Sequence, residues 1–66
     1  MDQKAIFLEM DEKIQLIKKT AQDMTKMGED FPALYRNTQR ILASAKMLEL
    51  NISDIMDLVG RTSRSG

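Results

Sequence analysis

The chain contains no cysteine and no histidine, and its only aromatic residues are two phenylalanines and one tyrosine. The lack of cysteine excludes disulfide bonds, and the lack of both residue types excludes the common zinc sites. The usual nucleophile–base pairs of catalysis are missing as well, because most of them use a thiol or an imidazole. We therefore expect a protein that is not an enzyme and that binds no metal and no cofactor.

Long hydrophobic runs are also absent. The longest uninterrupted apolar run is Ala5–Leu8, whereas a transmembrane helix needs about 20 apolar residues. The same run is too short for the apolar core of a signal peptide. Ten basic residues balance ten acidic ones, so no overall field attracts the chain to nucleic acid or to a membrane. These features predict a cytoplasmic protein without a membrane partner.

Two ladders of mainly apolar residues, spaced by alternating steps of three and four, are the strongest pattern in the chain. This spacing keeps side chains on one seam of a packed helix. The first ladder comprises Phe7, Met10, Ile14, Ile17, Ala21 and Met24. The second comprises Phe31, Leu34, Thr38, Ile41, Ala45, Leu48, Ile52, Ile55 and Val59. The pattern predicts two long helices and an all-α fold.

A break between the ladders divides the chain into two helices. We expect a helix over about residues 3–27, a turn over about 28–31 and a second helix over about 32–59. The second ladder is out of phase with the first by three residues, and a slip at Gly and Pro is typical of a chain reversal. The sequence therefore predicts an antiparallel helical hairpin in one domain, residues 1–60, followed by a flexible tail, residues 61–66.

Local signals predict where the helices end. Gly28 is suited to the left-handed conformation that ends many helices. Asp30 is suited to capping the second helix, and Pro32 to its first turn. Asn51 and Ser53 favour caps over helix interiors, so a short third helix could begin there. The ladder keeps its phase through Ile52, Ile55 and Val59, which favours one helix, bent or straight.

A single hairpin of this length is marginal, because a domain of about 60 residues buries only about 60% of its unfolded surface. With disulfides and metals excluded, association with another chain is the remaining way to cover the apolar stripes. Apolar residues beside the ladders, among them Ile6, Leu42 and Met56, widen both stripes beyond a two-stranded seam. We therefore expect a homodimeric four-helix bundle. Its predicted dimer core comprises Phe7, Met10, Ile14, Ile17, Met24, Leu34, Ile41, Leu48, Ile52 and Ile55.

The charges divide each helix into two halves. Residues 1–12 and 49–58 each carry a net charge of −3, and residues 13–27 and 32–48 each carry +3. Within one hairpin, the two basic halves lie side by side and so do the two acidic halves. A second hairpin with its turn at the opposite end would set basic halves against acidic ones. We therefore expect the turns of the two copies to lie at opposite ends of the dimer. A chance pattern among solvated charges is the alternative explanation.

Ala43, Met47 and Leu50 form a second apolar group, away from the ladder of the second helix. Three apolar residues on one stripe, including a flexible methionine, are typical of a partner-binding surface. Wider burial within the dimer, or no role at all, would explain the same pattern. We expect a non-catalytic interaction protein that serves as an adaptor, regulator or accessory subunit for an unidentified protein partner.

A nucleic-acid-binding hairpin dimer is the alternative function. Clustered basic residues near the turn would bind phosphates, but specific RNA readers usually add stacking aromatics. Both Phe7 and Phe31 are assigned to the ladders, so a solvated helix face is the ordinary explanation of the basic residues. The possible contacts are Lys18, Lys19, Lys26, Arg36 and Arg40.

Overall fold

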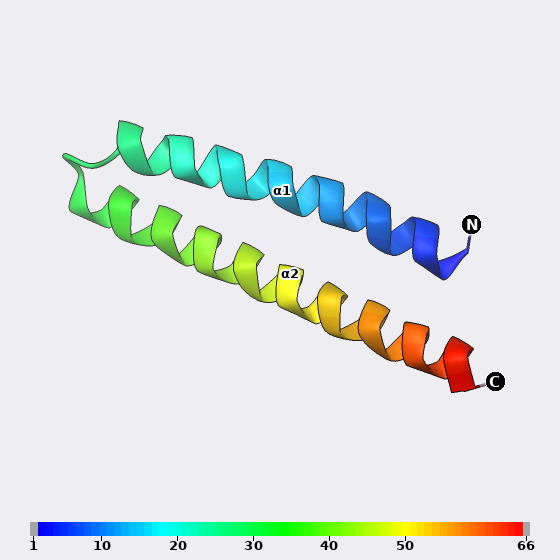
Figure 1. The fold of residues 1–66 in the computed structure, drawn as a ribbon. Helices are drawn as coiled ribbons and strands as arrows, with labels where there is room; N and C mark the ends of the chain where they lie inside the picture. Colours follow the sequence, from blue (N-terminus) through cyan, green and yellow to red (C-terminus); the bar gives the residue numbers. More distant parts are fainter. Residues whose placement is uncertain (1, 66) are drawn as a thin grey trace.

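The computed structural model describes the backbone of residues 2–65 and the side chains of residues 2–58. Residues 2–65 form two α-helices joined by a short turn, and they contain no strand. Helix α1 spans Gln3–Met27 and helix α2 spans Pro32–Ser65. The helices pack side by side and run antiparallel (Figure 1). The predicted all-α helical hairpin is confirmed.

Helix α1 begins where the sequence predicts, because Asp2 caps it. The Asp2 Oδ1 atom accepts a hydrogen bond from the Ala5 N–H at 2.8 Å, and the Asp2 carbonyl accepts one from the Ile6 N–H at 3.2 Å. The side-chain bond satisfies one of the four N–H groups that have no partner within a helix. No Pro or Gly interrupts α1 before its end at Met27.

The turn differs from the prediction in two details. Gly28 has φ −102° and ψ 11°, so it is not left-handed. A Cβ atom at Gly28 would lie 3.3 Å from the Met24 carbonyl oxygen, so a close backbone approach explains the glycine instead. Pro32 opens α2 as predicted, since its missing N–H costs nothing there. The residue before the helix is Phe31 rather than Asp30, and its carbonyl accepts the first hydrogen bond of α2 at 2.9 Å.

Helix α2 is longer than predicted. It continues without interruption through Asn51–Ser53, so the single helix is confirmed there and the alternative break is wrong. It also passes the expected end near Val59 and runs to Ser65. A glycine such as Gly60 costs only about 1 kcal/mol in a helix, and no proline follows to stop it. The side chains of Val59 and of the predicted tail, residues 61–66, lie outside the described part, so the flexibility of the tail stays a prediction.

The core of the hairpin is one narrow line of contacts between the helices. Ile14 and Ala21 of α1 and Ala45 and Ile52 of α2 are each at most 5% exposed. Two of these four side chains are single methyl groups, so the core holds little apolar volume for its length. The partly buried hydrophobic side chains that pack against it at the open end are Phe7 and Met56.

The molecule is a single layer of two helices. Its principal-axis extents are 54 × 18 × 12 Å, and the smallest extent is about one helix diameter, roughly 10–12 Å. The radius of gyration is 15.5 Å, against about 11 Å for a compact domain of this length. A domain ordinarily packs two layers around a core, whereas both broad faces of this hairpin lack a covering element within residues 2–65.

Replacing Ala45 with leucine tests the close contact between the helices. Ala45 is 1% exposed, so the larger side chain must push the helices apart and should lower the free energy of unfolding by about 1–3 kcal/mol. Ala43→Leu, at an exposed position of the same helix, is the control and should change it by less than about 0.5 kcal/mol. Urea denaturation followed by circular dichroism measures both. Equal stability of the Ala45→Leu variant and the wild type would contradict the contact.

Candidate functional site

Each ladder alternates between two positions of a seven-residue repeat. Within residues 2–58, the helices contact each other through one of these two positions. The buried position holds Ile14 and Ala21 in α1 and Ala45 and Ile52 in α2. The second position, three residues further along each helix, turns out of the contact and is at least 41% exposed throughout residues 2–58. We call the residues at this position the apolar face: Met10, Ile17, Met24, Leu34, Ile41, Leu48 and Ile55.

The apolar face lies on one side of the hairpin and crosses from one helix to the other. Ile17 of α1 lines a shallow hollow together with Ile41 and Leu48 of α2. The next hollow toward the turn is lined by Ile17, Met24 and Ile41. Because Ile17 of α1 and Ile41 of α2 line both hollows, the apolar side chains of the two helices form one strip, rather than two, over this part of the hairpin.

The opposite side of the hairpin, which we call the polar face, carries hydrogen bonds between the helices. At its centre the Lys18 ammonium lies 3.0 and 3.2 Å from the two carboxylate oxygens of Glu49. The Gln15 side-chain amide donates to the same carboxylate. Glu49 therefore binds two residues of α1 from the middle of α2.

A second polar cluster joins the helices nearer the turn. Thr25 Oγ1 donates to the Ala21 carbonyl at 2.8 Å and accepts from the Gln39 side-chain amide at 3.0 Å. Thr38 Oγ1 lies 3.3 Å from Thr25 Oγ1 and donates to the Tyr35 carbonyl at 2.9 Å. Thr38 is the buried polar residue of this part of the chain, and its hydroxyl is satisfied by these two partners.

Sequence reasoning missed the polar face. Lys18, Thr25 and Glu49 each lie four residues after a buried ladder position, whereas the apolar face lies three residues after one. Steps of four and of three place side chains on opposite flanks of the contact line. The seven-residue spacing of the partly buried polar residues Asp11, Lys18 and Thr25 is the signal that marks this flank in α1.

The predicted dimer core divides into two groups. Ile14 and Ile52 are buried and Phe7 is half-buried within the hairpin itself. The other seven predicted residues are the apolar face, and all of them are exposed in the single chain. The hairpin thus uses three of the ten residues internally and presents the rest on one side.

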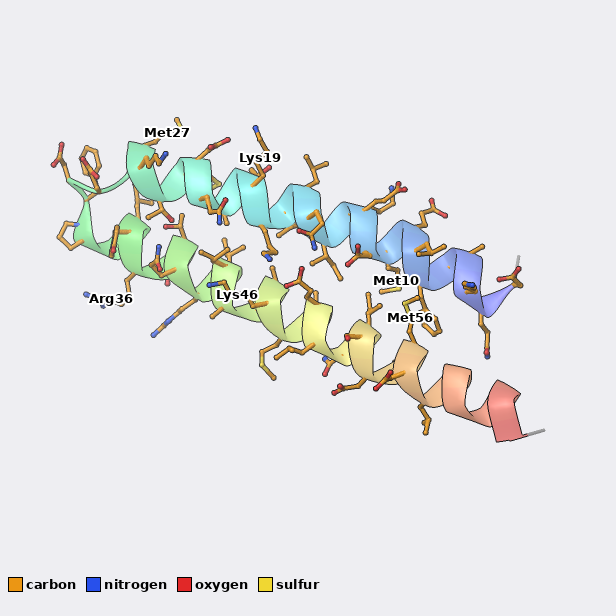
Figure 2. All side chains as sticks on the ribbon, in the orientation of Figure 1. Met10, Lys19, Met27, Arg36, Lys46 and Met56 are labelled. Atoms are coloured by element: carbon orange, nitrogen blue, oxygen red, sulfur yellow. The ribbon has the colours of Figure 1, made fainter. Side chains whose placement is uncertain are left out.

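The five basic residues proposed for nucleic-acid contact lie on several sides of the turn half. Lys18 is already paired within the hairpin. Lys19 points away from α2 and Arg36 points away from α1 (Figure 2). Arg40 lines a hollow of the apolar face, and Lys26 lines one on the polar face. The structure therefore does not gather these charges into one patch.

The second apolar group is exposed on α2. Met47 and Leu50 are each 57% exposed, and Ala43 is exposed as well. None of the three belongs to the hairpin core. Partner binding by this group stays a prediction.

No protein-family model, curated protein or solved structure matches this chain. Among the described residues, no three carboxylates come close enough together to hold a metal ion. No helix in that part of the chain is long and apolar enough to cross a membrane. The candidate functional site is the apolar face, because seven exposed apolar side chains share one ladder position along the described hairpin.

The pH dependence of stability tests the polar face. The hydrogen bond from Gln15, followed by that from Lys18, lowers the pKa of Glu49 below its ordinary value of 4.5. A carboxylate with a lowered pKa stabilises the fold above the pKa of the unfolded chain and loses this effect as the pH falls through the folded-state value. Glu49→Gln should therefore lower the melting temperature at neutral pH and weaken its fall on acidification.

Glu12→Gln is the matched control, because Glu12 is an exposed carboxylate of α1. Thermal denaturation of both variants and the wild type, repeated from neutral to acidic pH, measures the effect. The control should follow the wild-type pH dependence. If Glu49→Gln follows it too, the Lys18–Glu49 contact contributes nothing in solution.

Proposed function

We propose that the protein is a small, non-catalytic helical interaction protein that acts as a homodimer, in the role of an adaptor, regulator or accessory subunit. The observation that carries this proposal is the apolar face, seven exposed apolar side chains along one side of a single layer. Single exposed apolar residues are ordinary on protein surfaces. A continuous apolar strip on a chain this small is typical of an interface.

The exposed area of the chain supports association. Its accessible surface is 5423 Å², whereas a compact monomer of 7.6 kDa exposes about 4,300 Å². The excess, about 1,100 Å², is larger than the roughly 800 Å² that each partner buries in a standard interface. Burying a standard interface would therefore lower the exposed area to about 4,600 Å², closer to that of a compact protein of this mass.

The small core supports the same proposal. Among residues 2–58, Ile14 and Ile52 are the large buried apolar side chains of the core, and the other two buried apolar residues are alanines. Below roughly 70–80 residues, a single core rarely supplies more than about 3–5 kcal/mol. A second copy on the apolar face would add a second layer, which is the architecture of a four-helix bundle.

Two leucines of α2 provide a matched test of the homodimer. Leu48 belongs to the apolar face and Leu50 does not, although they are 42% and 57% exposed in the single chain. Leu48→Lys should raise the dissociation constant of the dimer about 100-fold or more, since each copy loses a buried leucine worth about 1.5–3 kcal/mol. Leu50→Lys should leave it within about fivefold of the wild-type value.

Sedimentation equilibrium over a range of protein concentrations measures these constants. A wild-type chain that stays monomeric at all concentrations would contradict the homodimer. If the two substitutions raise the dissociation constant equally, the dimer interface does not lie on the apolar face. Salt-sensitive binding of RNA or DNA that is abolished by Arg36→Ala combined with Arg40→Ala would instead favour the nucleic-acid-binding alternative.

A further inference from the structure

The apolar face contains a palindromic set of three residues in each helix. In α1 the set is the whole face, Met10, Ile17 and Met24. In α2 the face has four residues, and the set is the three nearest the open end, Ile41, Leu48 and Ile55, with Leu34 beyond it toward the turn. Each set of three has the same residue type at both ends, at equal spacing from the middle. A two-fold rotation perpendicular to a helix reverses the direction of that helix. It therefore places each set of three on an identical set in a second copy.

The buried ladder positions lack this symmetry. They are occupied by Phe7, Ile14 and Ala21 in α1, and by Thr38, Ala45 and Ile52 in α2. Reversal would exchange a phenylalanine with an alanine in one helix and a threonine with an isoleucine in the other. These residues make their contacts inside one chain, where no two-fold axis acts on them. The palindrome is thus confined to the face that a second copy would cover.

The centres of the two palindromes lie at the same level of the hairpin. Ile17 and Leu48 line one hollow of the apolar face. The Lys18–Glu49 ion pair, one residue further along each helix, joins the helices at the same level at 3.0 Å. One axis level with Ile17 and Leu48 therefore serves both helices. In α2 the residues Leu34, Ile41 and Leu48 also have the same type at both ends, but their centre, Ile41, also lines this hollow and lies nearer the turn than the ion pair.

We infer that a second copy packs on the apolar face with its turn at the opposite end, about a two-fold axis level with Ile17 and Leu48. This inference rests on the proposed homodimer and adds its orientation and register. Each helix then lies antiparallel to the same helix of the second copy. Ile17 and Leu48 each meet their own counterpart, while Met10 meets a second Met24 and Ile41 a second Ile55.

The charge distribution supports the same orientation. Residues 2–12 and 49–58, at the open end of the hairpin, together carry a net charge of −6, and residues 13–48 carry +4. The proposed rotation sets the positive half of each copy against the negative half of the other. With both turns at one end, like halves would face each other. Charges at the rim of an interface select orientation more than they strengthen binding.

The two orientations place different residues next to each other. With turns at opposite ends, Ser44 of one copy and Asn51 of the other lie level on adjacent α2 helices, because the axis passes midway between these positions. With turns at the same end, α2 lies beside α1 of the second copy. Ser44 then lies level with Thr20 of that copy, since both residues line hollows of the apolar face that share Ile17 and Ile41.

Single cysteines distinguish these orientations, because the chain has none of its own. Ser44→Cys and Asn51→Cys proteins are mixed, unfolded, refolded together and oxidised, and disulfides are identified by mass spectrometry. We expect a mixed disulfide in up to about half of the dimers, the fraction that random pairing makes mixed. Neither protein alone should crosslink, because each cysteine lies about 10 Å along the helix from its counterpart.

A mixture of Thr20→Cys and Ser44→Cys proteins is the matched control and should give no mixed disulfide. Circular dichroism and light scattering establish that every single-cysteine protein is helical and dimeric. A dimer that forms the Thr20–Ser44 disulfide, or neither disulfide, overturns the register but leaves the homodimer standing. A wild-type chain that is monomeric by light scattering overturns both.

Discussion

The narrow contact line between α1 and α2 is the constraint on which the rest of the structure depends. Ile14 and Ala21 meet Ala45 and Ile52 along it, and these side chains are buried almost completely. Two helices in one layer can bury little more than such a line, because residues three or four positions away turn to one flank or the other. Each ladder is therefore split: one position is used inside the chain, and the other is left on a surface.

The two flanks of this line have different roles. The polar face includes the Lys18–Glu49 pair, and partly exposed ion pairs of this kind contribute little to stability. The pair joins α1 to α2 at a position near the middle of the hairpin. That position also brings Ile17 level with Leu48 on the apolar face. The polar contacts on one side thus lie level with the middle of the apolar surface on the other.

The sequence predicted the larger features of the fold and missed several local ones. Periodicity over many residues identified both helices, and the phase slip at the Gly–Pro break identified the chain reversal. The backbone conformation of Gly28, the residue that precedes α2 and the continuation of α2 past Gly60 all differed from the prediction. Each of these details depends on about 1 kcal/mol of local preference, which neighbouring residues easily outweigh.

The sequence by itself determined that the chain forms two antiparallel helices and which residues make up the ladders, because apolar periodicity reports the face of a helix directly. Only the tertiary structure decided which ladder residues serve the hairpin and which form the candidate interface. Ile14 and Ile17 are the same residue type on one ladder, yet the first is buried and the second is 42% exposed. The difference comes from the rotation of α1 about its own axis. Contacts between residues far apart in the sequence accompany that rotation, such as the one between Lys18 and Glu49, 31 positions apart, and no local pattern records them.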